Sequence, residues 1–211
     1  MSRPRHSPKP AAAPGESQPV VGLRIIGGKF RGRLLEYSGD PRTRPMKDRV
    51  RESVFNLLGY LCKEKHALDL FAGTGALGLE ALSRGASRAT LLERHYPTAK
   101  IIEGNIAKLG ASDAAQACFA DAFLWTKNFC ASANSGDSPP WLVFCSPPFE
   151  FYVSRREEML SMISRLAEAA PVGSAFVVEA DENFDMTLLP HPTAWDVRTY
   201  PPAVLGIWEK K

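Results

Sequence analysis

Short apolar runs alternate with amphipathic stretches along most of the chain, and this pattern constrains the fold more than any other feature. Strands are expected at 66–70, 88–93, 115–119, 141–145 and 173–180, and helices at 76–84, 97–109, 121–128 and 154–170. Apolar strands separated by helices are typical of a parallel sheet that helices cover on both faces. Two more strand patterns, at 194–200 and 203–209, meet at Pro201 and Pro202 and are expected to add an antiparallel edge. The sequence therefore predicts an α/β fold with a seven-stranded, mostly parallel sheet.

The chain before this alternation divides into two parts. Residues 1–20 are rich in proline, alanine and serine, and this composition cannot bury enough apolar surface to fold, so a disordered tail is expected. Residues 21–62 are expected to form a small basic hairpin, followed by a helix that begins at Asp48. Residues 63–211 then form the α/β domain.

Composition excludes several classes of protein. The 211 residues are 45% hydrophobic and 23% charged, which fits one globular domain and neither a disordered nor a fibrous chain. No apolar run approaches the roughly 20 residues that a membrane helix needs, and the first residues lack the apolar core of a secretory signal. An intracellular protein is therefore expected. The four cysteines lie far apart without a CxxC pair, which predicts reduced core thiols and no metal site.

Positive charge is concentrated in one segment. Residues 24–51 hold nine basic and three acidic residues, whereas the rest of the chain after them holds 14 basic and 19 acidic ones. Such a segment attracts polyanions, although a solvated charged face is the ordinary alternative. We favour nucleic-acid binding, because Gly27, Gly28 and Gly32 would let the backbone approach phosphate and Phe30 could stack on a base. The candidate RNA-binding residues are Arg24, Lys29, Arg31, Arg33, Arg44, Arg49 and Arg51.

A glycine-rich loop follows the first strand of the alternation. Gly73, Gly75 and Gly78 fit the GxGxxG pattern between a strand and a helix, and Glu93 ends the next strand about 20 residues on. Glycines permit a tight turn close to a ligand, and the carboxylate can accept both hydroxyl hydrogens of a ribose. The pattern predicts a nucleoside-containing ligand but does not by itself separate NAD from S-adenosylmethionine.

Two aspartates refine this prediction. Asp69 precedes the glycine turn, where its charge would repel a pyrophosphate but suits the positive amino-acid end of S-adenosylmethionine. A turn-forming or capping carboxylate is the alternative for Asp69. Asp121 follows the third strand and is placed either to accept from an adenine amino group or to cap the next helix. The candidate cofactor-binding residues are Asp69, Phe71, Ala72, Gly73, Thr74, Gly75, Glu93 and Asp121.

A diproline turn closes the fourth strand. Consecutive prolines lock φ and cannot continue a strand, so they would fix the Pro147 carbonyl at the carboxyl edge of the sheet, where open α/β folds bind ligands. Two acceptors on the N–H groups of an exocyclic base amine favour a pyramidal nitrogen with an available lone pair. Ser146 Oγ and the Pro147 carbonyl could supply them while Phe149 stacks on the base; an ordinary strand-ending turn is the alternative. The candidate catalytic residues are Ser146, Pro147, Pro148 and Phe149.

Taken together, these segments resemble the RsmD-type 16S ribosomal RNA guanine-N2 methyltransferases over nearly all of 23–211. The resemblance rests on RIIGGKFRGR at 24–33, RP at 44–45, DRVRE at 48–52, FN at 55–56, DLFAGTGALGLEALSRGA at 69–86 and PPF at 147–149. It implies a Rossmann-like class I methyltransferase fold, S-adenosylmethionine as donor and no metal. The implied acceptor is the N2 amine of a guanine in 16S ribosomal RNA. The implied setting is the 30S subunit or an assembly intermediate in the bacterial cytoplasm, with the protein acting as a monomer.

The chain departs from the family pattern at two places. Ser146 stands where the family's turn normally begins with Asp, and Met46 and Lys47 replace a hydroxyl-bearing pair. Amino methyltransferases that act on other bases use a Ser-Pro-Pro-aromatic turn, so another base is one alternative. A second is an S-adenosylmethionine-binding RNA or ribosome-assembly protein in which Ser146 marks lost catalysis. An NAD-dependent oxidoreductase would leave the basic segment and the diproline turn unexplained. A DNA amino methyltransferase would lack a separate target-recognition domain.

Overall fold

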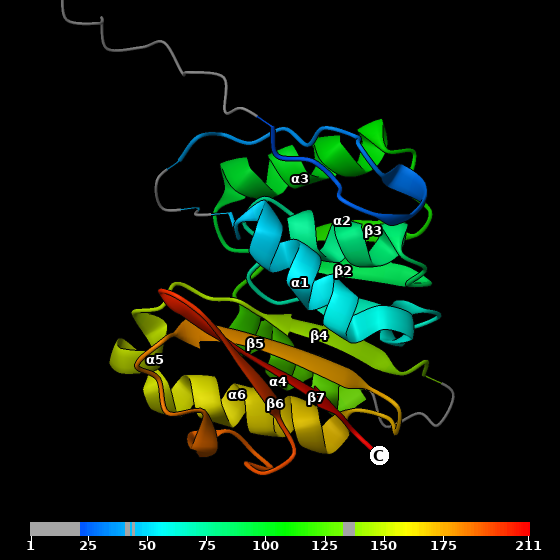
Figure 1. Cartoon of the computed structure of the whole chain (residues 1–211). Coiled ribbons are helices and arrows are strands. Elements are labelled where there is room, and N and C mark those ends of the chain that lie inside the picture. Colours follow the sequence, from blue (N-terminus) through cyan, green and yellow to red (C-terminus); the bar gives the residue numbers. More distant parts are fainter. Residues whose placement is uncertain (1–21, 41–42, 44, 133–137) are drawn as a thin grey trace, which may run out of the picture.

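The centre of the molecule is a seven-stranded sheet with the strand order β3-β2-β1-β4-β5-β7-β6 (Figure 1). The computed structural model describes residues 22–40, 43, 45–132 and 138–211. The parallel strands are β1 (His66–Asp69), β2 (Arg88–Glu93), β3 (Ala115–Phe119), β4 (Trp141–Cys145) and β5 (Ala175–Asp181). The strands β6 (Asp196–Tyr200) and β7 (Ala203–Glu209) add the antiparallel edge beside β5. The predicted topology is therefore confirmed, while the predicted tail at 1–20 lies outside the described residues.

Helices cover both faces of this sheet (Figure 1). One face carries α1 (Asp48–Leu58), α2 (Ala76–Ser83) and α3 (Tyr96–Lys108). The other face carries α4 (Ala122–Ser132), the short α5 (Phe151–Ser154) and α6 (Arg156–Ala169). Short 3-10 turns lie at Gly28–Phe30, Gly59–Cys62 and Met186–Leu188.

Side chains of the central strands alternate between two buried clusters, as the pleat of a strand requires. On β4, Leu142 and Phe144 pack toward α1, α2 and α3. Their neighbours Val143 and Cys145 pack toward α4 and α6. The four cysteines are free, and all but the half-buried Cys118 are buried, as expected for core thiols. No helix in the described part of the chain has both the length and the apolar character needed to cross a bilayer.

Two predicted elements differ in detail from the observed ones. The helix expected at 154–170 is interrupted at Arg155, whose φ of −132° is not helical, so α5 and α6 are separate. The expected hairpin is reduced to one antiparallel bridge between Arg24 and Leu34. A 3-10 turn lies between these two residues and takes the place of regular strand pairing.

The segment before α1 is attached to α2 by a buried carboxylate. Glu80 is fully buried, and its two oxygens accept the backbone N–H groups of Ile26 and Gly27, each at 2.7 Å. Arg84 Nε donates to the same carboxylate at 2.8 Å. Because a buried carboxylate needs this many donors to offset its lost hydration, the contact orients the whole segment against α2.

The two adjacent glycines of this segment serve that docking. A Cβ at Gly28, where φ is +76°, would lie 1.9 Å from the Ser83 carbonyl oxygen, and one at Gly27 would lie 2.5 Å from the Arg84 guanidinium. For these two glycines the expected approach to phosphate is therefore wrong, since both face α2 at close range, whereas a Cβ at Gly32 would meet nothing within 4 Å. Glycine is needed here for packing between segments of the protein itself.

Candidate active site

The loops that follow β1, β2, β3 and β4 surround a cavity of about 740 Å³ at the carboxyl edge of the sheet. This edge is where open α/β folds bind their ligands. Ten of the twelve candidate cofactor-binding and catalytic residues line it: Phe71, Ala72, Gly73, Thr74, Glu93, Asp121, Ser146, Pro147, Pro148 and Phe149. The glycine loop and the diproline turn, which are more than 70 residues apart in the chain, therefore form one site.

The glycine loop has the geometry that its sequence predicts. Gly73 and Gly75 have φ values of +51° and +77°, which favour glycine, and the Gly75 N–H closes the turn on the Ala72 carbonyl at 2.7 Å. A Cβ at Gly78 would lie 2.9 Å from Leu91 on β2, so this glycine lets α2 pack closely on the sheet. Gly75 lies behind the cavity wall and supports the loop rather than lining the cavity.

Asp69 lies beneath the glycine loop, outside the cavity lining. It is 1% exposed, and its Oδ2 accepts the Gly78 N–H at 3.0 Å, while Oδ1 has no hydrogen-bond partner. Burial raises the pKa of this carboxyl to about 7, and the negative charge of nearby Glu93 contributes to the rise. The backbone N–H groups of Gly78 and Phe71 act in the opposite direction and lower the pKa. The expected direct contact with a ligand's ammonium group is not available in this arrangement. Asp69 instead has the turn-forming role that was its alternative.

Glu93 is held at the cavity wall by two backbone donors. Its Oε2 accepts the Gly73 N–H at 3.0 Å, and its Oε1 accepts the His95 N–H at 2.7 Å. The side chain thus bridges the end of β2 and the glycine loop. A carboxylate that is fixed in this way and lines a nucleoside-sized cavity suits the two hydroxyl groups of a ribose.

Asp121 has the helix-capping role that was one of its two alternatives. Its Oδ1 accepts the N–H groups of Phe123 at 2.9 Å and Leu124 at 3.1 Å, which is the geometry of a helix cap for α4. The residue also lines the cavity beside the loop after β3. A capping contact through Oδ1 is compatible with a ligand contact through Oδ2.

The turn after β4 lines the cavity beside the glycine loop, because β4 pairs directly with β1. Ser146 and Phe149 are half-buried and Pro147 is buried, and all three line the cavity. The Ser146 hydroxyl donates a hydrogen bond to the carboxylate of Glu179, which lies on β5 and lines the same cavity. Burial raises the pKa of the Glu179 carboxyl, and the hydrogen bond from Ser146 partly offsets this rise.

Arg51 is not an RNA-binding residue in this fold. Its side chain is fully buried, and its Nη2 donates to the Arg24 carbonyl at 2.7 Å and to Asp48 Oδ1 at 3.0 Å. The prediction failed because a guanidinium within the basic segment was used to hold that segment to α1. The predicted residue Arg44 lies outside the described residues.

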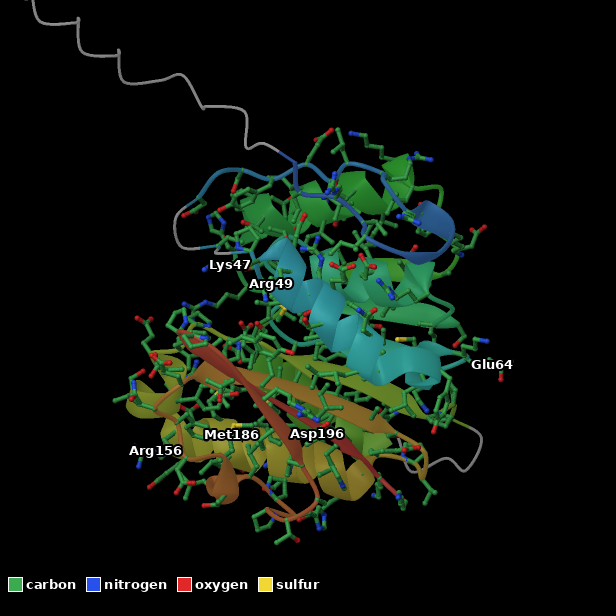
Figure 2. All side chains as sticks on the ribbon, in the orientation of Figure 1. Lys47, Arg49, Glu64, Arg156, Met186 and Asp196 are labelled. Carbon is green, nitrogen blue, oxygen red and sulfur yellow. The ribbon has the colours of Figure 1, made fainter. Side chains whose placement is uncertain are left out.

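The remaining basic candidates lie away from the cavity lining. Lys29 and Arg31 are exposed and flank Phe30, whose N–H donates to Ser83 at the carboxyl end of α2, the end away from the glycine loop and the cavity. Arg33 Nη2 donates to the Lys108 carbonyl at the end of α3, and Arg24 lies 3.9 Å from Asp48. Arg49 is exposed at the amino end of α1. Figure 2 shows it beside Lys47 and far from Glu64, which precedes β1 at the amino edge.

Sequence analysis missed the cations that do line the cavity. These are Lys47, Arg94 and Arg155. The Arg155 guanidinium lies 3.9 Å from the centre of the Phe123 ring, and the Arg94 guanidinium lies 5.4 Å from that of Phe151. They were missed because they lie singly on three different elements. Glu179 was also missed, although a charged residue within the apolar run of β5 is a signal that could have marked it.

Known proteins resemble this chain over most of its length. The family model described as Conserved hypothetical protein 95 matches residues 23–199. Ribosomal RNA small subunit methyltransferase D of Escherichia coli K12 is 34% identical over 197 residues, which span 93% of this chain and 87% of that protein. The protein of the same name from Haemophilus influenzae is 34% identical over 142 residues, spanning 67% of this chain and 70% of its own. The solved structure of yhhF from Escherichia coli has a TM-score of 0.69 and 31% identity, covering 90% of this chain and 98% of that one. With its class I methyltransferase topology, this chain therefore belongs to the RsmD-type family of ribosomal RNA small subunit methyltransferases.

Proposed function

We propose that this protein transfers a methyl group from S-adenosylmethionine to the N2 amine of a guanine in 16S ribosomal RNA. The observation that carries the proposal is the cavity that the glycine loop and the diproline turn line together. Gly73 and Phe149 both line that cavity. The proposed binding site for the donor and the proposed binding site for the base thus share one space.

The residues present fit S-adenosylmethionine. Glu93 presents a fixed carboxylate to the ribose, the loop at 71–74 gives a close-packed backbone wall, and Asp121 lies where an adenine would be placed by the order of the strands. When bound, S-adenosylmethionine supplies a methyl group on a positively charged sulfur. The protein's part is to orient donor and acceptor and to exclude water from between them.

The diproline turn fits an exocyclic amine. The ring of Pro147 fixes its φ, and the following Pro148 restricts its ψ to extended values, so the Pro147 carbonyl has a fixed direction. Ser146 also precedes a proline and is restricted to extended conformations. Ser146 Oγ and the Pro147 carbonyl are therefore two preorganised acceptors for the N–H groups of a base. The half-buried ring of Phe149 is available to stack on that base.

The choice of RNA as substrate rests on the family and on the charge at the cavity. Lys47, Arg94 and Arg155 are cations within a lining that also holds carboxyl groups, and as single positive charges they suit the phosphates that flank an extruded nucleotide. Because proteins read RNA sequence mainly in unpaired segments, the target is expected to be an unpaired or extruded guanine of the 30S subunit or of an assembly intermediate.

Methyl transfer to unmodified 30S particles tests the proposal. We expect tritium from labelled S-adenosylmethionine in 16S ribosomal RNA, recovered after digestion as N2-methylguanosine. Methylation of adenine or cytosine instead would refute the base assignment. Absence of transfer, with intact binding of S-adenosylhomocysteine in calorimetric titration, would favour a non-catalytic ribosome-assembly role.

Two serine variants, one at the site and one outside it, test the role of Ser146 in this assay. Ser146→Ala should lower turnover by about 10²-fold or more, because an acceptor on the reacting amine is lost. Ser154 lies on α5 outside the cavity lining, and its hydroxyl donates to the Glu150 carbonyl. Ser154→Ala should therefore leave turnover unchanged, and equal activity of both variants would remove Ser146 from the mechanism.

A further inference from the structure

Glu179 and Ser146 are brought together by the register of the sheet. Cys145 on β4 pairs with Val178 on β5, so the next residue on each strand lies beside the other at the carboxyl edge. Phe144 and Val177, two residues earlier on each strand, belong to the same buried cluster, so Ser146 and Glu179 follow on the same face of the sheet. The contact is therefore set by the strand pairing and does not depend on a surface loop.

The direction of the hydrogen bond determines what Ser146 can offer a ligand. A hydroxyl has one hydrogen and two lone pairs, and here the hydrogen is directed at Glu179. The lone pairs of Ser146 Oγ remain available to accept. Hydrogen bonds in which one partner is ionised are the stronger ones, so a carboxylate behind the hydroxyl also increases its power as an acceptor.

Glu179 is a costly residue to keep in this position. It is 9% exposed and lies within a strand whose other residues from 175 to 180 are apolar. The Ser146 hydroxyl donates to it, and the phenol of Tyr152 on α5 contacts Cys145 in the other buried cluster. The pKa of Tyr152 is raised by burial, then by Cys145, and last by the charge of Glu179. No cation pairs with Glu179 among the ion pairs of the described residues, and a buried carboxylate in this position is destabilising, which is typical of a residue kept for function.

Methyl transfer creates a demand that this pair can meet. As the nitrogen–methyl bond forms and the methyl–sulfur bond breaks, the sulfonium becomes a neutral thioether and the amine nitrogen becomes positively charged. The nitrogen must then lose one proton. If that proton passes to Ser146 Oγ while the hydroxyl hydrogen passes to the Glu179 carboxylate, the methylated amine and the hydroxyl end neutral and the carboxyl carries the proton.

We infer that Glu179 is a positioning residue for methyl transfer, which directs the Ser146 hydroxyl so that its lone pairs face the substrate amine and which accepts the released proton through that hydroxyl. This inference rests on the proposed function. It also explains how a turn that begins with serine is supplied with a carboxylate, because the charge comes from the neighbouring strand.

A double-variant cycle on kcat tests the inference. Glu179→Gln should lower kcat by about 10²-fold. The KM for RNA and the affinity for S-adenosylhomocysteine should change by less than about threefold. In the Ser146→Ala background the same change should cost less than about threefold, because its partner is already absent. Equal costs in both backgrounds would refute action through Ser146.

Two further variants separate a specific role from general damage. Glu182 is exposed and lies outside the cavity lining, so Glu182→Gln should leave kcat unchanged. In Ser146→Asp/Glu179→Gln the carboxylate stands on the turn itself, and kcat should recover at least tenfold over Glu179→Gln. Failure of the double variant to recover, in a protein that still binds S-adenosylhomocysteine, would contradict the inference.

A readout without turnover keeps the inference testable if no methylation is found. The side-chain carboxyl carbon of Glu179, assigned in NMR spectra by its loss in Glu179→Gln, should titrate at a higher pH in Ser146→Ala than in the unaltered protein. The reason is that the hydrogen bond from Ser146 stabilises the carboxylate. An unchanged pKa would show that the two groups do not interact and would overturn the inference. Absence of methyl transfer with a shifted pKa would count against the proposed function and the proton-accepting role, and would leave the contact itself established.

Discussion

Replacement of Glu80 by glutamine should loosen the segment before α1 from the rest of the protein. The change keeps the shape of the side chain. However, the carboxylate accepts the N–H groups of Ile26 and Gly27 on its two oxygens, and the single amide oxygen can accept only one of them. The amide NH₂ then faces the other N–H, donor against donor. Arg84 also loses its charged partner. One unsatisfied buried donor and a weakened ion pair together should lower the free energy of unfolding by about 2–4 kcal/mol.

Urea denaturation followed by circular dichroism measures this change. Thermal unfolding should show the same loss as a lower Tm. For a chain of this size, each kcal/mol corresponds to roughly 2–4 °C, so the Tm should fall by roughly 4–16 °C. Trypsin should also cleave faster after the exposed Lys29 and Arg31, because the released segment becomes accessible. Glu103→Gln is the matched control: Glu103 pairs with Lys100 at 2.7 Å, but both side chains are about half exposed, so the loss should be below about 1 kcal/mol. A Glu80→Gln variant as stable as this control would refute the assigned role of the buried carboxylate.

Three further predictions concern the loop, the helix behind it and the RNA. Because the pKa of Asp69 is raised from 3.8 to about 7, its contribution to stability is complete below pH 4 and is lost as the pH rises to about 7. In calorimetry, the Tm of Asp69→Asn should therefore rise relative to the Tm of the unaltered protein between pH 5 and pH 8. A difference in Tm that stays constant over this range would contradict the assigned pKa. Gly78→Ala should cost about 1–3 kcal/mol in urea denaturation, because its Cβ would overlap Leu91; an unchanged midpoint would show that α2 shifts freely. Arg155→Ala should flatten the dependence of log affinity for small-subunit RNA on log salt by about one, and Arg31→Ala should not. The opposite ranking would place the RNA at the other sheet edge.

Local patterns were sufficient to predict the sheet and the two loops of the site. The strands at 88–93, 115–119, 141–145 and 203–209 have the predicted bounds, because each is a short apolar run closed by a turn. The loop at Gly73 and the turn at Pro147 were predictable because glycine and proline restrict the backbone within a few residues. These features depend on neighbours in the sequence, which a single sequence shows directly.

The docking of the basic segment depends on residues far away in the chain. The Glu80 carboxylate that holds Ile26 is 54 residues from it, and nothing in the pattern at 24–33 indicates that its glycines face another helix. Arg51 reads as one more basic residue in a charged run, yet its side chain is fully buried. The partnership of Ser146 and Glu179 spans 33 residues and follows only from strand register, which the sequence does not determine by itself.

The cavity walls also have a consequence for how the protein is made. They include Asp40 near one end of the described chain and Ala203 near the other, with contributions from the loops after β1, β2, β3 and β4. During synthesis from the amino terminus, a nascent chain that has passed Phe149 already carries the glycine loop and the diproline turn, but it still lacks β5, Tyr200 and Ala203. The complete cavity lining is thus present only after synthesis has passed Ala203, and protection from proteolysis by S-adenosylhomocysteine would report the moment at which the cavity has formed.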